Sequence, residues 1–283
     1  MTCMICGGST GYYFTKAYGA PPAVKAFMDP IGPVDYHRCD QCGFTYSKTH
    51  QDLMPAQWSE LNERFHHYNE TDPHVRDKMN QPPYAEQAFM LAYLKANGMI
   101  VGANMLDYAA GYGTLSQLLA DLFHVRLPIY DPYVKGGDLS RYVDRPQPRS
   151  YGTVINSAYF EHVLDRAALD AINDCVADDG CLIVHTVICE RIPRDPNWFY
   201  LAPPVHTAFH TNKSMSVLME QWGYQSSIYS PQAKCWILYK KPFAELEPTM
   251  VKMNRELQAK WFYGKDGFLD YWKGFADPLP RDD

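Results

Sequence analysis

The chain has 283 residues, of which 46% are hydrophobic and 20% charged, and its formal net charge is −6 at pH 7. This length accommodates one sizeable core with an appendage, or two domains. The 26 Lys and Arg residues are scattered without a basic stripe, which argues against a nucleic-acid partner. No apolar run approaches a membrane span, and cysteines stand where a signal peptide needs its apolar region, so we expect a cytoplasmic protein without membrane contact.

Two Cys-x-x-Cys pairs lie near the start of the chain, Cys3 with Cys6 and Cys39 with Cys42. Two thiolates at this spacing bind one tetrahedral ion from a tight knuckle. The pattern predicts a structural Zn²⁺ site in a module of residues 1–52, because four thiolates leave no open position for catalysis. A redox dithiol is the alternative. The proline-rich segment between the pairs predicts a loop with short strands.

Residues 53–97 are predicted to form helices with a break at Gln81-Pro82-Pro83. Phe65–Asn69, His74 and Tyr84 bring many hydrogen-bonding and aromatic side chains into this segment. We expect a lid ahead of the following nucleotide-binding segment, with a solvated helical connector as the alternative. The apolar spacing in Tyr84–Leu94 predicts a helix packed on a sheet.

The next stretch, Met-Leu-Asp-Tyr-Ala-Ala-Gly-Tyr-Gly-Thr-Leu, reads as strand, glycine turn and helix. We expect the strand over Met99–Leu106 and the helix over Thr114–Phe123. A helix N-terminus after such a turn presents free N–H groups to a nucleotide-like ligand. Asp107 selects the ligand, because its carboxylate can meet the ammonium group of S-adenosylmethionine but would repel a pyrophosphate.

This stretch resembles the first motif of the class I S-adenosylmethionine-dependent methyltransferases, which Asp107, Gly111 and Gly113 match. Ala109 stands where that family usually has its first glycine, so we expect an ordinary backbone conformation there. The resemblance implies an α/β fold with a Rossmann-like sheet over residues 98–242, joined to the N-terminal zinc-binding module and to C-terminal helices. It also implies that these four residues bind the cofactor.

Asp131 follows a predicted strand over Val125–Tyr130, about 20 residues beyond the glycines, where a carboxylate can accept from both ribose hydroxyls. The next predicted strand, Gly152–Asn156, begins soon after, so we expect the third strand and its helix to be abbreviated. Asn156 ends that strand at the sheet edge where ligands bind, and we count it among the cofactor-binding residues.

The sequence Tyr159-x-Glu161-His162 follows at the same edge. Together with the Cys-x-x-Cys pairs, it resembles the sugar C-methyltransferases that act on nucleotide-linked deoxysugars. The resemblance implies that His162 is the base and that Tyr159 and Glu161 line the acceptor pocket. Those enzymes carry a large additional C-terminal domain, and from its length we expect this chain to lack one. The alternative is a structural pair in which Glu161 caps a helix and His162 packs beneath it.

Further along, a buried strand is predicted over Cys181–Val187, a helix over Lys213–Trp222, and a hairpin from Tyr224–Tyr229 with Cys235–Tyr239. The Pro-x-His-x₇-Ser pattern that contains His206 resembles the loop before the last helix in the same subgroup, where the histidine faces the acceptor. His210 is the second candidate in this loop. For either histidine, a structural role is the alternative.

Residues 243–283 are predicted to be a helical extension, with an amphipathic helix over Glu245–Phe262 followed by an aromatic tail. We expect it to pack on the same chain, and a homodimer contact is the alternative.

The predicted function is methyl transfer from S-adenosylmethionine to a small-molecule acceptor, a sugar or related metabolite. A histidine titrating near neutral pH suits the base in that reaction, and His162 is our candidate. Three alternatives stay open: an RNA or protein methyltransferase recruited by its zinc module, a non-catalytic scaffold of the same fold, and a nicotinamide oxidoreductase. The last rests on the near match of Gly111-x-Gly113-x-x-Ser116 to the dinucleotide fingerprint.

Overall fold

The structure is a computed structural model that describes residues 1–71, 82–133 and 138–270. The chain divides into two compact units, and each combines segments that are distant in sequence. The first unit comprises Met1–Gln81, Phe160–Ala168 and Val187–Ser214. The second comprises Pro82–Tyr159, Leu169–Thr186 and Met215–Asp283. Over the described ranges, no helix has both the length and the apolar character needed to cross a membrane.

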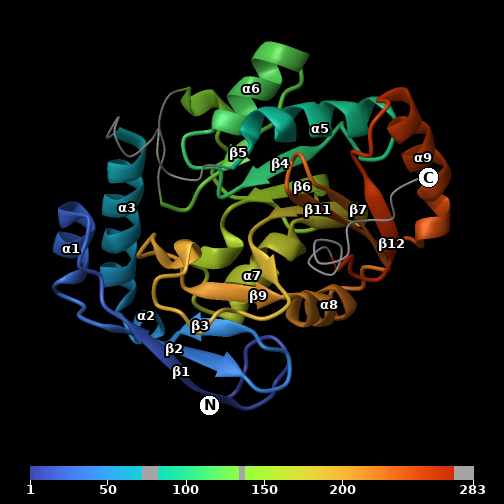
Figure 1. The fold of residues 1–283 in the computed structure, drawn as a ribbon. Helices are drawn as coiled ribbons and strands as arrows, with labels where there is room; N and C mark the ends of the chain where they lie inside the picture. The colour runs from blue at the N-terminus through green and yellow to red at the C-terminus, as the bar shows by residue number, and fades with distance from the viewer. Residues whose placement is uncertain (72–81, 134–137, 271–283) are drawn as a thin grey trace. The chain divides into compact units, whose positions relative to one another are not determined.

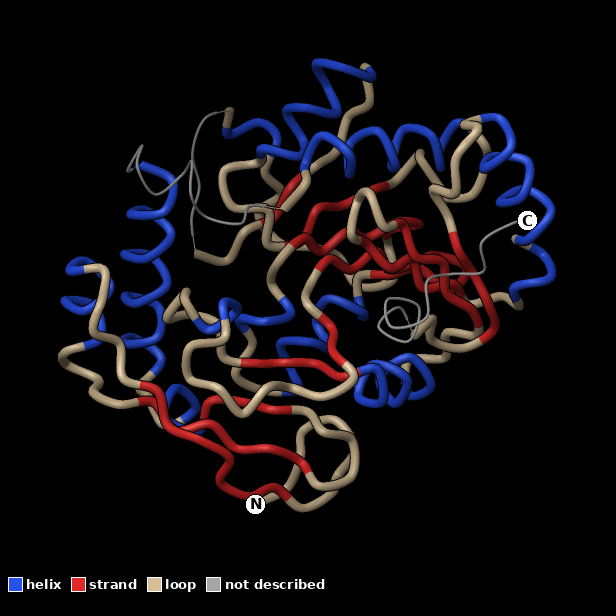
Figure 2. Tube along the Cα trace, viewed as in Figure 1, coloured by secondary structure: helices blue, strands red, loops and turns tan. Residues whose placement is uncertain are grey.

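The second unit is built on a seven-stranded sheet with the order β12-β10-β11-β7-β6-β4-β5. Its strands are β4 (Met105–Tyr108), β5 (Ile129–Tyr130), β6 (Tyr151–Ser157), β7 (Val176–His185), β10 (Ser226–Ser230), β11 (Cys235–Tyr239) and β12 (Tyr263–Asp266). The strands β4 to β7 are parallel, whereas β11, β10 and β12 each add an antiparallel neighbour. Figure 2 shows these strands running through the unit as one layer. This sheet confirms the predicted α/β, Rossmann-like fold class.

Helices of the second unit cover this sheet. They are α5 (Tyr84–Ala96), α6 (Thr114–Phe123), α9 (Glu247–Glu256), and parts of α7 (Arg166–Asp174) and α8 (Asn212–Gln221). The helices α5 and α6 contact each other and run along one side of the sheet (Figure 1). The buried face of α5 carries Met90, Leu91 and Leu94, which join the main apolar core with Met105 from β4. The predicted packing of this helix on a sheet is therefore confirmed.

Several predicted boundaries in this unit are wrong. The strand expected from Met99 begins only at Met105, because the apolar residues Met99 and Ile100 are buried from a turn after Gly98. The strand expected from Val125 has only two residues. Among the described residues between β5 and β6, η1 (Leu139–Arg141) and a parallel bridge between Ile129 and Tyr142 stand where the abbreviated third strand is predicted.

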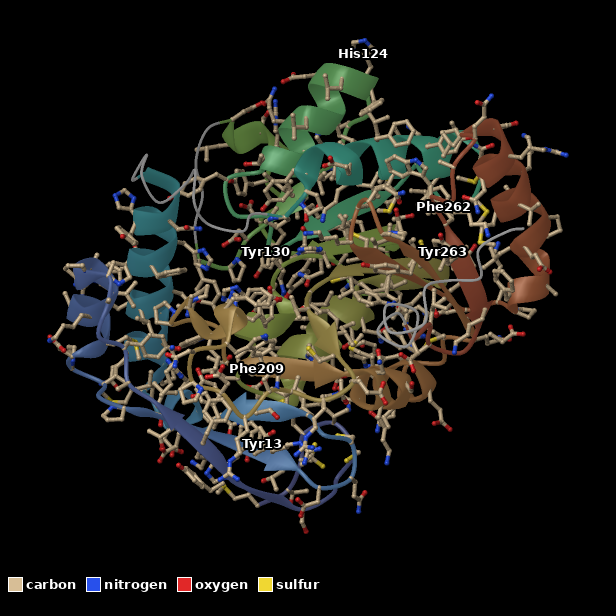
Figure 3. All side chains as sticks on the ribbon, in the orientation of Figure 1. Tyr13, His124, Tyr130, Phe209, Phe262 and Tyr263 are labelled. Atoms are coloured by element: carbon tan, nitrogen blue, oxygen red, sulfur yellow. The ribbon has the colours of Figure 1, made fainter. Side chains whose placement is uncertain are left out.

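The C-terminal extension also differs from its prediction. Helix α9 ends at Glu256, and β12 then adds an edge strand to the sheet that the sequence pattern did not reveal. Met253 and Phe262 are buried in the main core, which confirms that this segment packs on its own chain (Figure 3). Its distal tail, with Tyr271, Trp272 and Phe275, lies outside the described residues.

The first unit contains a five-stranded sheet with the order β1-β2-β3-β9-β8. Its strands are β1 (Thr10–Lys16), β2 (Val34–Cys39), β3 (Thr45–Ser47), β8 (Ile188–Cys189) and β9 (Ala208–Thr211), and its helices are α1 (Pro22–Met28), α2 (Lys48–Gln51) and α3 (Pro55–Thr71). Helix α1 lies in the segment predicted to be a loop; Pro22 at its first turn is compatible with a helix start. Two short helices, η2 (Phe160–His162) and η3 (Phe199–Leu201), complete the unit.

Strand β9 joins the sequence-distant parts of the first unit. It pairs antiparallel with β3, placing Phe209 opposite Thr45, and parallel with β8. The apolar core beneath combines Phe209 with Tyr36 from β2 and Trp58 from α3. The predicted buried strand Cys181–Val187 is divided accordingly: β7 ends at His185, and the chain continues into β8 of the other sheet.

Candidate functional site

The glycine turn of the second unit connects β4 to α6, as the sequence predicts. Helix α6 begins at Thr114 after Gly113, which has φ +77° and supplies no side-chain cap. The positive φ of Gly113 favours glycine, and a Cβ there would also lie 2.7 Å from Cδ1 of Ile129, whereas Gly111 (φ +55°) faces open space. A hollow of about 300 Å³ adjoins this helix start and is also lined by Arg141. The turn therefore combines an uncapped helix N-terminus with open space over its backbone.

The expected ordinary backbone conformation at Ala109 is wrong, because its φ is +61°. The turn requires a left-handed residue directly after β4, which a glycine would adopt without a steric cost. For an alanine, the contact of its Cβ with the following carbonyl costs roughly 1–2 kcal/mol. The turn geometry is therefore kept although the usual glycine is absent.

Asp131 holds the glycine turn from the end of β5. Its two carboxylate oxygens accept hydrogen bonds from the N–H groups of Gly111 and Tyr133, each at 2.8 Å. The hydroxyl of Tyr142 donates to the Gly111 carbonyl, also at 2.8 Å. Each carboxylate oxygen has two lone pairs, so a carboxylate that accepts from two backbone N–H groups can in chemical terms also accept from ribose hydroxyls.

Asp107 is the most informative side chain of the turn. It is only 2% exposed, and its Oδ1 has no hydrogen-bond partner among the described residues. Burial, and to a lesser extent the charge of Asp131, raises the pKa of Asp107 well above its ordinary value. Nearby, Asn156 donates from Nδ2 to the Tyr108 carbonyl at 2.8 Å, and its buried Oδ1 has no partner in the same described set. The ends of β4 and β6 thus offer buried oxygen acceptors, which fit the ammonium group of an amino-acid ligand.

The first unit gathers Glu161, His162 and His206, three of the four predicted catalytic side chains, which are 2%, 5% and 9% exposed. Their potential ligand atoms all lie within 4.8 Å of one another. The rings of His162 and His206 are nearly perpendicular, with centroids 4.9 Å apart. On its other side, His162 meets the ring of His66 from α3 at 5.3 Å. We call Glu161, His162, His206 and His66 the histidine cluster.

Burial keeps two imidazoles of the histidine cluster, those of His162 and His206, neutral at physiological pH. Burial lowers the pKa of His206 to about 3. Burial also lowers the pKa of His162 well below its ordinary value, and the neighbouring His206 and His66 lower it further. An unprotonated imidazole has a nitrogen lone pair, so these rings are in the state that can accept a proton.

A family model described as a methyltransferase domain matches residues 52–226, which is more than half of the chain. This protein belongs to the methyltransferase-domain family. The predicted enzyme class is thereby confirmed, while the acceptor is left open. A comparison with curated protein sequences finds no match.

A comparison with solved structures finds methyltransferases at low similarity. The plantazolicin methyltransferase BpumL, solved with S-adenosylhomocysteine, has 10% identity and a TM-score of 0.37, covering 66% of this chain and 98% of that one. A Nostoc punctiforme protein named as an O-methyltransferase has 17% identity and a TM-score of 0.38, covering 56% of this chain and 60% of that one. The Haemonchus contortus phosphoethanolamine N-methyltransferase 2, solved with S-adenosyl-L-methionine, has 13% identity and a TM-score of 0.38, covering 69% and 50%. This methyltransferase therefore spans less than two thirds of the length of the last two.

Tyr159, the fourth predicted catalytic residue, belongs to the second unit of this methyltransferase. Its ring lies 6.2 Å from that of Tyr108, which contacts Tyr130 edge-on at 5.0 Å. Burial raises the pKa of Tyr159, so its hydroxyl stays protonated at neutral pH. The structure thus groups it with the tyrosines around the glycine turn. Tyr108 and Tyr130 are not among the residues predicted from the sequence. Each nevertheless ends a strand next to a predicted cofactor-binding residue, Asp107 and Asp131 respectively.

His210 has the surroundings of a structural histidine. It is fully buried in β9, with its ring 5.0 Å from Phe44 and 5.6 Å from Phe160. His66 lies in the predicted lid segment and is, with His67 and Tyr68, a further candidate base should His162 be structural. Tyr200 is not among the residues predicted from the sequence, because its contacts join segments that are distant in the chain. His74 lies outside the described residues.

The four cysteines of the predicted metal site converge in the first unit of this methyltransferase. The Sγ atoms of Cys3 and Cys42 are 3.7 Å apart, and those of Cys6 and Cys39 are 3.4 Å apart. A tetrahedral ion with Zn–S bonds of about 2.3 Å requires S–S separations of about 3.8 Å, so the cluster fits Zn²⁺. The backbone N–H of Ile5 also approaches Cys3 Sγ at 3.4 Å, and the contact with Cys42 lowers the pKa of Cys3 to about 5. Both features favour a thiolate at Cys3, whereas the same contact and burial raise the pKa of Cys42.

Proposed function

We propose that this methyltransferase transfers the methyl group of S-adenosylmethionine to a small-molecule acceptor, a sugar or nucleotide-sugar-like metabolite. The observation that carries the cofactor assignment is Asp107, whose buried carboxylate oxygen has no partner among the described residues. When bound, S-adenosylmethionine supplies a methyl group on a cationic sulfur, which is the electrophile. Asp107 would meet its ammonium group, Asp131 its ribose hydroxyls, and the backbone at Gly111 and Gly113 would approach it closely.

The acceptor assignment rests on Tyr159-x-Glu161-His162 and its likeness to sugar C-methyltransferases. An in-line displacement needs the acceptor held at attack distance, with water kept away and any acidic proton removed. We assign that proton to the imidazole of His162, which burial keeps neutral. In this proposal Glu161 and Tyr159 orient the acceptor, and His206 lies against the base.

The test is S-adenosylhomocysteine release from S-adenosylmethionine over a panel of acceptors. We expect nucleotide-linked deoxysugars to give turnover, and RNA and protein substrates to give none. Methylation confined to RNA or protein would replace the acceptor assignment with the recruitment alternative. A protein that binds S-adenosylmethionine but turns over no acceptor would support the scaffold alternative instead.

We further propose that Cys3, Cys6, Cys39 and Cys42 hold one structural Zn²⁺. The support is the convergence of four thiols, all within 4.8 Å of one another. Because the set is closed, the ion would stabilise the first unit and take no part in methyl transfer.

A further inference from the structure

We propose that Tyr200, in η3, is a positioning residue of the histidine cluster: its hydroxyl orients Glu161 while its carbonyl fixes the proton of His206. This inference deepens the proposed function, because it rests on the histidine cluster being the acid-base site. It concerns a residue to which neither the sequence motifs nor the family match assigns a role.

The tautomer of His206 follows from one contact. Its Nδ1 lies 2.7 Å from the Tyr200 carbonyl oxygen. A carbonyl can only accept a hydrogen bond, so Nδ1 carries the proton and the neutral ring has its lone pair on Nε2. The two side-chain rings also pack together, with centroids 4.6 Å apart. The backbone of Tyr200 therefore sets which nitrogen of His206 can take a proton.

Glu161 is held by the other end of the same residue. The Tyr200 hydroxyl donates to Glu161 Oε1 at 2.5 Å and accepts from the N–H of Val187 at 3.1 Å. The position of the hydroxyl is thus fixed by one hydrogen bond that it donates and one that it accepts. The backbone of Glu161 is fixed as well, since its carbonyl accepts from the N–H of Thr207 at 2.6 Å. A buried carboxylate held in this way has little freedom to turn.

This arrangement has an electrostatic consequence. A short hydrogen bond from a tyrosine disperses negative charge on the carboxylate. Without it, more negative charge on an ionised Glu161 would lie within 4.8 Å of a ring nitrogen of His162 and of His206 and would favour their protonation. In this proposal Tyr200 adds to the burial and the neighbouring rings that lower the pKa of His162.

Histidine NMR on the full chain tests this without any acceptor. We would follow ring ¹⁵N and ¹³C signals of labelled histidines through a pH titration, assigning His162 and His206 by their loss in His→Asn variants. Tyr200→Phe removes the hydroxyl and keeps the carbonyl. We expect His206 to stay protonated on Nδ1, and the pKa of His162 to rise by about 0.5 to 1 unit. The matched control is Tyr13→Phe, which removes another tyrosine hydrogen bond of the first unit, from its hydroxyl to the Ile192 carbonyl at 2.9 Å.

The decisive comparison is made in a Glu161→Gln background. If Tyr200 acts through the carboxylate, Tyr200→Phe should no longer shift the pKa of His162 there. An equal shift in that background, an unchanged pKa in the single variant, or a His206 protonated on Nε2 would overturn the proposal. A metal ion bound by Glu161, His162 and His206 would also overturn it, and would appear as histidine signals that change on chelation in Tyr200→Phe and wild type alike. Failure of the base assignment is separate, because it would appear as unchanged turnover in His162→Asn.

Discussion

The two units of this protein differ in how their sites are built. In the second unit, Asp107, the glycine turn and α6 are consecutive in the chain, so a short motif fixes the geometry. In the first unit, the histidine cluster combines residues from α3, η2 and the loop before β9, which are about 100 and 40 residues apart along the chain. A site made of consecutive residues, such as the glycine turn, can be predicted from residue spacing. The histidine cluster cannot, because it depends on which distant segments pack together.

The two sites also differ in the groups they offer to a ligand. The turn of the second unit offers buried carboxyl and amide oxygens, which suit an ammonium group, whereas the histidine cluster offers the imidazoles of His162 and His206, which burial keeps neutral and able to accept a proton. If the second unit binds the cofactor and the first unit supplies the base, changes in each unit should have separate effects. The change expected to affect a whole unit comes first.

Zinc removal should have the largest effect, and it should be confined to the first unit. We expect purified protein to contain one Zn²⁺ per chain and Cys39→Ala to lose it. Structural zinc sites contribute on the order of 10 kcal/mol, so the first unit should unfold while the second keeps its secondary structure. Metal analysis with limited proteolysis measures both effects.

The matched control for this prediction is Cys189→Ala, which changes a buried thiol in β8 of the same unit outside the cysteine cluster. It should keep the ion. Zinc-free protein with an intact first unit would contradict the metal assignment, and two ions per chain would indicate a second site at the histidine cluster.

His162→Asn should lower turnover by roughly 10² to 10⁴ while leaving cofactor affinity and folding intact, as expected for a positioned base. Because burial lowers the pKa of His162, wild-type turnover should be flat around neutral pH and fall only well below pH 6.5. Folding stability should also decline as pH falls below about 6.5, since the unfolded chain then binds more protons than the folded one.

The control is His124→Asn, at the left-handed C-cap of α6 (φ +55°), where the side chain projects from the end of the helix (Figure 3). Asparagine is tolerated in that conformation, so turnover should not change. If His162→Asn unfolds the protein or loses the cofactor, the structural interpretation of the Glu-His pair is correct.

Asp131→Ala should weaken S-adenosylmethionine binding at least tenfold by calorimetry, since charge-assisted hydrogen bonds contribute about 1.5 to 3 kcal/mol each. The variant also removes the acceptor that holds the Gly111 N–H, which adds to the loss. The control is Asp121→Ala on the exposed side of α6, where the carboxylate accepts hydrogen bonds from Nε2 of Gln117; this variant should bind normally. Preferential binding of NAD would refute the cofactor assignment.

Ala109→Gly should have the smallest effect, and it should stabilise the protein. Removing the Cβ relieves the left-handed strain, and this gain exceeds the entropy cost of a glycine by about 0.5 to 1 kcal/mol. Ala110→Gly next to it has no strain to relieve and should destabilise by a similar amount. Thermal unfolding of both variants measures the difference, and equal shifts would mean that the turn is not strained.

Much of the second unit was predictable because its signals are local. Helix α6 has the predicted bounds, and the predicted cofactor residues lie in and around one turn. Strand lengths were not predictable, since Met99 and Ile100 are buried without joining the sheet. In the first unit, the cysteine pairs converge as their spacing indicates. The role of Tyr200 could not be predicted from the sequence, because its contacts form only where the segments that carry Glu161 and His206 come together in the fold.

The most direct test of the cofactor assignment uses Asp107→Asn. Because burial raises the pKa of this carboxyl, the folded protein prefers it protonated, and ionisation destabilises the ligand-free protein as pH rises from about 3.8 through the raised pKa. The asparagine variant should therefore unfold at a higher temperature than the ligand-free wild type at neutral pH. It should also bind S-adenosylmethionine far more weakly, because the partner of the ammonium group is lost. A variant that binds S-adenosylmethionine with wild-type affinity would contradict the account.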